Sequence, residues 1–109
     1  MPLPPPSVLI ASQSLLFARD DGASIDVAVE IYEPEAVDDR TWACAFIIRG
    51  FEDEIVRHIF GVDSMQALVL SLHVVPSEVQ ALARRASGRF LTDADLGLDH
   101  ACGVHLGKR

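Results

Sequence analysis

The chain has 109 residues, half of them apolar, so it is long enough to form the core of one small domain. Its 16 acidic and 9 basic side chains give a formal charge of −7, which disfavours binding to the phosphate backbone of a nucleic acid. No apolar run approaches the roughly 20 residues that span a bilayer, and the first residues lack the pattern of a signal peptide. We therefore expect a cytoplasmic protein that binds neither nucleic acid nor membrane.

The first seven residues are rich in proline, which supports neither a helix interior nor a strand ladder. We expect an extended, poorly ordered leader at residues 1–7, a single α+β domain at residues 8–98 and a flexible tail at residues 99–109. The prolines of the leader are Pro2, Pro4, Pro5 and Pro6.

The first two predicted strands are joined by a tight turn. The apolar run from Val8 to Ala18 is followed by Asp21-Gly22, and an Asp-Gly pair between apolar runs is typical of a β-hairpin. Apolar and polar residues then alternate over residues 25–32. This alternation predicts a strand with one face on a core and the other toward water.

Two further strands follow a polar loop. Over residues 41–49 both alternating sets are apolar or small, which is typical of a central strand covered on both faces. A turn at Gly50 precedes a fourth predicted strand over residues 54–60. Four strands joined by short turns predict a four-stranded antiparallel β-meander.

A helix is predicted after the last strand. Asp63 and Gln66 have the spacing of a capping box, and apolar residues recur every three or four positions from Met65 to Val75. Pro76 interrupts this pattern, so either one long kinked helix or two consecutive helices packs on one face of the sheet. The sequence thus predicts an α+β fold with an irregular C-terminal tail.

The opposite face of the predicted sheet is apolar and has no second helical layer to cover it. Ala43, Ala45 and Ile47 lie on this face of the third strand. Exposed apolar surfaces of this kind mark association. We therefore expect a homodimer formed by sheet faces or edges, unless the C-terminal segment covers the surface. The fourth strand adds either Val56 and Phe60 or Ile55 and Ile59 to it.

Metal-ligating residue types gather near the C-terminus. His100, Cys102 and His105 are side chains of the kinds that zinc binds. No second spaced pair completes a closed site, and nothing nearby orders the loop before a metal arrives. We therefore expect neither a metal site nor a cofactor, and these three residues are the candidates if a metal is bound.

Two histidines are the candidates for catalysis. His58 on the fourth strand and His73 on the helix could each act as a general base. No Ser, Cys or carboxylate stands at a spacing that pairs with either of them in a recognisable motif. The sequence therefore favours structural roles for both histidines and predicts no catalytic residue.

The segment from Trp42 to Leu72 contains Trp-x3-Phe-x-Ile-x-Gly, followed by Gly-Val-Asp-Ser-Met-Gln-Ala-Leu at residues 61–68. Together with Leu96-Gly97-Leu98, these motifs resemble a small bacterial family of uncharacterised domains. The resemblance covers roughly two thirds of the chain and implies a ββββα-type domain of unknown function. Its signatures are a strand hairpin and a capped helix, so it carries over no catalytic residue.

Three functions fit the sequence. A non-enzymatic protein-interaction module of the bacterial cytoplasm fits best, because structural signals run through the chain and no reactive side chains converge. One alternative is an immunity or antitoxin-like protein that neutralises a basic partner, since residues 1–54 hold 11 acidic and 3 basic side chains, a charge of −8. The other is a small enzyme that uses His58 or His73.

Overall fold

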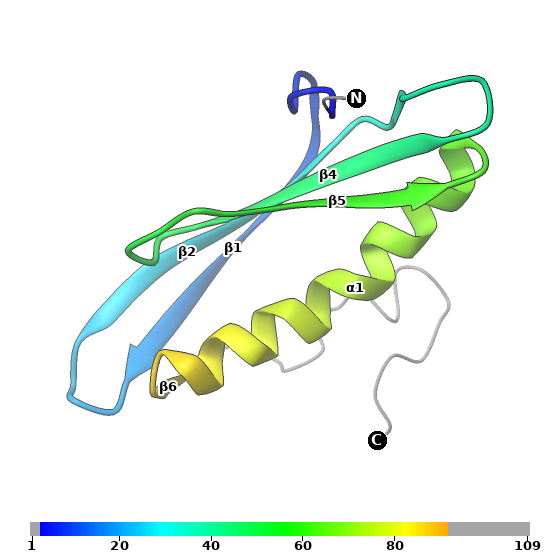
Figure 1. The fold of residues 1–109 in the computed structure, drawn as a ribbon. Coiled ribbons are helices and arrows are strands. Elements are labelled where there is room, and N and C mark those ends of the chain that lie inside the picture. Colours follow the sequence, from blue (N-terminus) through cyan, green and yellow to red (C-terminus); the bar gives the residue numbers. More distant parts are fainter. Residues whose placement is uncertain (1–2, 92–109) are drawn as a thin grey trace.

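The computed structural model describes residues 3–91. Within that range a single helix lies along one face of a twisted antiparallel sheet (Figure 1). No helix in these residues is long and apolar enough to cross a membrane. The elements are β1 (Leu9–Arg19), β2 (Ser24–Tyr32), β3 (Glu35–Ala36), β4 (Trp42–Arg49), β5 (Ile55–Gly61), α1 (Ser64–Arg85) and β6 (Gly88–Phe90).

The four long strands neighbour one another in the order β1, β2, β4 and β5. The short β3 pairs with the start of β4, and the short β6 pairs with the end of β1. The α+β class is therefore confirmed, but the predicted count of four strands is too low. With two and three residues, β3 and β6 are too short to show a period-two pattern in the sequence.

One continuous helix runs through Pro76, so the alternative of two consecutive helices is wrong. The helix begins at the expected cap, where the Asp63 carboxylate accepts a hydrogen bond from the Gln66 amide at 2.8 Å. The Gln66 side chain in turn accepts one from the Val62 amide at 2.8 Å. Pro76 itself is buried. Packing on the sheet therefore outweighs the loss of the helical hydrogen bond that proline cannot donate. From the local sequence alone, this loss predicts a helix break.

The residues of β4 alternate between two faces of the sheet. Cys44, Phe46 and Ile48 belong to the core between the sheet and α1, and none of them is exposed. The residues between them point to the opposite side, which we call the outer face. On β4 the outer face consists of Ala43, Ala45, Ile47 and Arg49.

The register of β5 on β4 decides which residues of β5 share the outer face. Val56 pairs with Ile47, and Phe60 pairs with Ala43. Directly paired residues point to the same side of a sheet, so the first of the two predicted pairs lies on the outer face. The pair that packs against the core instead is Ile55 and Ile59.

The end of β5 comes very close to the first turns of α1. A Cβ atom at Gly61 would lie 2.5 Å from the Ala67 amide nitrogen and 3.0 Å from the Ala67 Cα. Ala67 is itself fully buried. Glycine on the strand and a small residue on the helix together allow this approach, which sets the distance between helix and sheet.

We expect Gly61→Ala to lower the free energy of unfolding by about 1–3 kcal/mol, because the added methyl group must displace the backbone of α1. Equilibrium denaturation in urea measures the change. The control is Val62→Ala, which shortens an exposed side chain and should change stability by less than about 0.5 kcal/mol. Equal stability of Gly61→Ala and the parent chain would contradict the close approach.

Candidate functional site

The centre of the outer face is apolar and almost inaccessible to solvent. Ala43, Ala45 and Ile47 have exposed fractions of 3%, 5% and 6%. On the neighbouring strand β5, Val56 is 40% exposed and Phe60 is 46% exposed. The exposed apolar part of the outer face is therefore carried by β5, beside a buried centre on β4.

The start of the chain contacts this face at two points. The Pro4 carbonyl oxygen lies 3.1 Å from His58 Nε2, and the Ser7 hydroxyl donates a hydrogen bond to Glu35 Oε2 at 2.6 Å. His58 and Glu35 are the strand partners of the two alanines of β4, so both side chains belong to the outer face. The leader thus crosses part of the surface at which the sequence predicts an interface.

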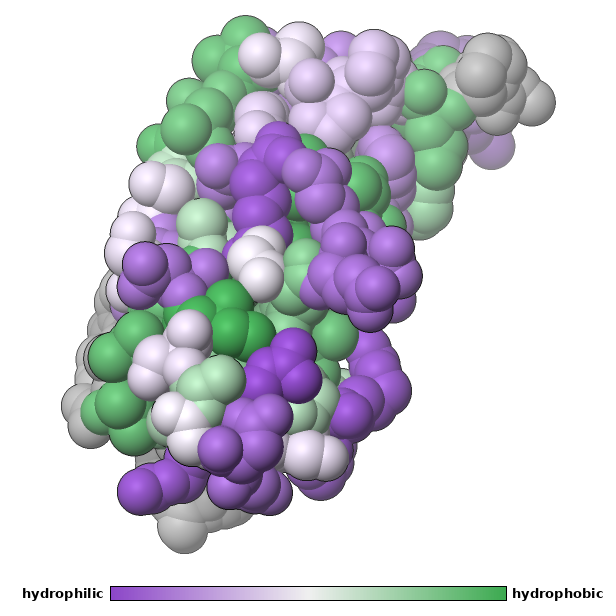
Figure 2. All heavy atoms as spheres, turned by 90° about the vertical axis from the view of Figure 1, so that its left-hand side faces the viewer, coloured by the Kyte–Doolittle hydropathy of each residue, from purple (hydrophilic) through white to green (hydrophobic). Residues whose placement is uncertain are grey.

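Acidic side chains gather at one end of the sheet. Asp20 and Asp21 lie in the turn between β1 and β2, and Glu52, Asp53 and Glu54 lie between β4 and β5. The antiparallel register places both turns at the same end. Figure 2 views the molecule from that end and shows hydrophilic side chains gathered over it. Acids are ordinary in turns, so this cluster by itself defines no binding site.

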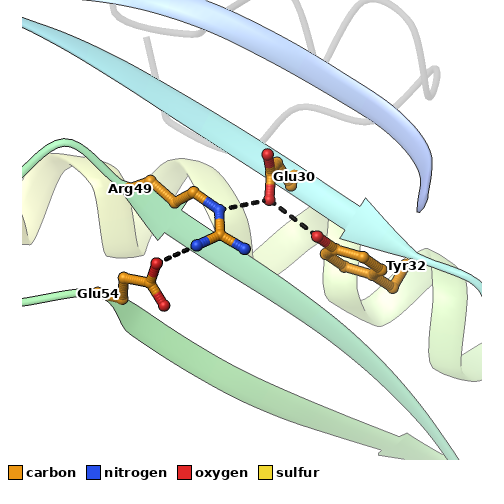
Figure 3. Close-up of polar contacts among 4 residues, drawn as sticks. All are labelled: Glu30, Tyr32, Arg49 and Glu54. Atoms are coloured by element: carbon orange, nitrogen blue, oxygen red, sulfur yellow. Dashed lines mark hydrogen bonds and ion pairs between the residues drawn. The ribbon is translucent and has the colours of Figure 1, made fainter. Parts of the chain in front are cut away.

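An ion-pair network lies on the outer face near this end. Arg49 Nε donates to Glu30 Oε1 at 2.8 Å, and Arg49 Nη1 contacts the Glu54 carboxylate. The Tyr32 hydroxyl donates to the same Glu30 oxygen at 2.9 Å. In Figure 3 the guanidinium lies between the two carboxylates, and Tyr32 approaches Glu30 from the other side. The single positive charge of Arg49 is already paired with two carboxylates, so it is not available to bind an anion. The network instead joins β2, β4 and the turn after β4.

The sequence by itself did not predict this network. The alternation of β2 places Glu30 on the polar side of its strand, but it does not name a partner. In the sheet Glu30 stands opposite Ile47 and diagonally across from Arg49. Because β3 and a loop intervene between β2 and β4, the register that creates this diagonal pair cannot be read from local pattern.

The two histidines have different surroundings. Within the part of the chain that the structure describes, His58 contacts a backbone carbonyl and His73 Nε2 is buried without a hydrogen-bond partner. The same residues hold no group of three or more His, Cys, Asp and Glu side chains that could bind a metal ion. The three candidate metal ligands lie outside the described residues: His100, Cys102 and His105.

Cys44 is a fully buried free thiol. Its sulfur donates a hydrogen bond to the Tyr32 carbonyl oxygen at 3.4 Å. Burial raises the pKa of the Cys44 thiol, which keeps it protonated at neutral pH. A protonated, inaccessible thiol is a packing group and a poor nucleophile.

A family model described as a domain of unknown function (DUF6968) matches residues 11–101. The chain belongs to this family. The match begins within β1 and includes Glu35 and His58 of the outer face, whereas leader residues 3–7 precede it. No curated protein and no solved structure matches the chain. The predicted resemblance to an uncharacterised domain family is confirmed.

The ion-pair network makes stability depend on pH. The hydrogen bond from Arg49 lowers the pKa of Glu30 below its ordinary value of 4.5; burial opposes this effect, and the Tyr32 hydroxyl reinforces it. A carboxyl group whose pKa is lowered by folding stabilises the fold above its unfolded pKa, and this contribution is lost as the pH falls through the folded pKa.

We therefore expect Glu30→Gln to show a smaller loss of stability than the parent chain as the pH falls from about 5 to about 3. Urea denaturation across this range measures the loss. The control is Glu52→Gln, which makes the same change in an exposed turn. It should leave the pH dependence of stability the same as in the parent chain. Identical profiles for the two variants would contradict the assignment to Glu30.

A second prediction concerns the thiol. In a Cys102→Ser chain, Cys44 is the single remaining cysteine. We expect iodoacetamide to label it at least about 100-fold more slowly in the folded protein than in urea, because labelling requires the core to open. Mass spectrometry over time measures both rates. Comparable rates would show that the thiol is accessible in the folded state.

Proposed function

We propose that the chain is a non-enzymatic protein-interaction module that binds through the outer face of the sheet. One observation carries this proposal: Val56 and Phe60 are exposed on β5, directly beside the buried apolar centre of β4. Large apolar side chains that stand exposed together on one face are typical of association sites. The proposal places the module in the cytoplasm of a bacterium, a reducing compartment in which the free Cys44 thiol would persist.

The position of β5 adds a second support. Among the described strands, β4 is the one partner of β5, so β5 forms an edge of the sheet. An edge strand offers unpaired amide and carbonyl groups to another chain. A second copy that met this face or this edge would bury Val56 and Phe60. We therefore infer a homodimer as the simplest association, with Ala43, Ala45 and Ile47 beneath the contact.

A basic partner protein is a second candidate, which the acidic end of the sheet favours. The turns of residues 20–22 and 50–54 present five acidic side chains there, of which Glu54 is paired with Arg49. Binding of this kind would resemble the neutralisation of a basic toxin by an acidic immunity protein. It would weaken as ionic strength rises, whereas association through the apolar outer face would persist.

We expect light scattering on size-separated protein to give the mass of a dimer at micromolar concentration, in the presence of a chelator and at both low and high ionic strength. Val56→Glu should convert it to a monomer, because the change places a charge in the apolar contact. Leu70→Glu is the matched control, since Leu70 is exposed to a similar extent but lies on α1.

A monomeric parent chain would overturn the homodimer, and so would loss of the dimer in Leu70→Glu but not in Val56→Glu. Association that a chelator reverses would point instead to metal bridging through His100, Cys102 and His105. Association that salt reverses would point to the acidic end.

A further inference from the structure

The leader is attached to the outer face by side chains from two different strands. His58 comes from β5 and Glu35 comes from β3, on opposite sides of β4. His58 Nε2 lies 3.1 Å from the Pro4 carbonyl oxygen, and Glu35 accepts a hydrogen bond from Ser7 at 2.6 Å. A carbonyl oxygen can only accept, so His58 Nε2 must carry the proton in this contact. The leader therefore crosses β4 with a polar contact on each side.

The dimensions of an extended proline-rich segment suit this crossing. Three residue steps separate Pro4 from Ser7, which corresponds to about 9 Å in the polyproline II conformation. Two strand spacings (about 10 Å) and two residue steps along β4 (about 7 Å) separate Glu35 from His58, which gives a diagonal of about 12 Å. The two lengths agree within the reach of the side chains involved.

Burial alternates along the leader. Pro4 and Pro6 are partly buried, whereas Leu3, Pro5 and Ser7 are exposed. Pro4 makes one of the polar contacts and Pro6 lies between the two, while Ala43 and Ala45 of β4 are almost fully buried. Figure 1 shows the described start of the chain, in dark blue, on the side of the sheet away from α1. Within the leader, partial burial thus falls on two of the three consecutive prolines.

Proline chemistry explains why side chains make these contacts. Pro4, Pro5 and Pro6 have no amide hydrogens, so the leader cannot extend the sheet as an added strand. It can offer carbonyl oxygens, which need donors from the receiving surface, and His58 supplies one. The polyproline II conformation is already extended before binding, so little conformational entropy is lost on docking.

We propose that the outer face recognises an extended proline-rich segment of a partner protein, and that leader residues 3–7 occupy this surface within the same chain until the partner segment displaces them. The proposal rests on the proposed function, because it names the class of partner that the interaction module binds. The receiving residues Glu35 and His58 lie within the family match, whereas the leader lies before it. The receiving surface therefore lies within the matched domain, and the leader that contacts it lies outside the match.

The test uses the full chain and a fluorescent peptide with the sequence Met1–Val8. Leader variant Pro4→Gly, Pro5→Gly, Pro6→Gly keeps the chain length but makes the leader more flexible, which weakens its docking. We expect the peptide to bind this variant at least about tenfold more tightly than the parent chain, because the competing leader has been weakened. Fluorescence anisotropy measures both affinities.

Two further variants in the leader-variant background locate the site. His58→Leu should weaken peptide binding about five- to tenfold, because the donor to the peptide carbonyl is lost. Arg57→Leu is the matched control, since Arg57 lies on the same strand but pairs with Glu78 of α1 on the inner face. It should leave peptide affinity unchanged. A peptide with glycine in place of its prolines should bind at least about tenfold more weakly.

Equal peptide affinity for the parent chain and the leader variant would overturn the proposal, as would equal effects of His58→Leu and Arg57→Leu. The mass of the leader variant distinguishes failure of the proline-rich partner from failure of the interaction module. A dimer that binds no peptide would overturn the proline-rich partner and leave the interaction module standing. A monomer that binds no peptide would overturn both.

Discussion

The structure depends on β4, the strand that is buried on both faces. Six of its eight residues are buried, and β2, β3 and β5 all pair with it. Its inner residues Cys44, Phe46 and Ile48 form the centre of the core. A strand in this position needs cover on both sides, because its apolar residues otherwise face water. The helix supplies the cover on one side, and our proposal places binding on the other.

The two faces are covered in different ways. On the inner face α1 approaches so closely that Gly61 meets the backbone at Ala67, and such tight packing leaves no freedom to exchange partners. On the outer face the cover is a short leader attached by two polar contacts, beside exposed side chains of β5. Contacts of that kind are individually weak and easily exchanged. This asymmetry is why the outer face is the binding surface in our proposal.

Most of the acidic side chains lie away from the apolar outer face. The acidic side chains are concentrated in turns at one end of the sheet, while Arg49 bridges Glu30 and Glu54 at the border of the outer face. Arg49 offsets one of the two negative charges that Glu30 and Glu54 carry beside the apolar centre, in a chain of net charge −7. This local ion pairing lowers the charge repulsion that association through the outer face would have to overcome in our proposal.

Features that depend on near neighbours in the chain were determined by the sequence itself. The alternation of β2, the apolar β4, the Asp21-Gly22 turn and the Asp63 cap all follow from local patterns, and each occurs as predicted. The remaining features were decided by the tertiary structure, because they depend on register and packing between distant segments. Only the register of β5 placed Val56 and Phe60 on the outer face, and only packing on the sheet kept α1 continuous through Pro76. The contact between Pro4 and His58 joins residues 54 positions apart, a separation at which no periodic pattern carries information.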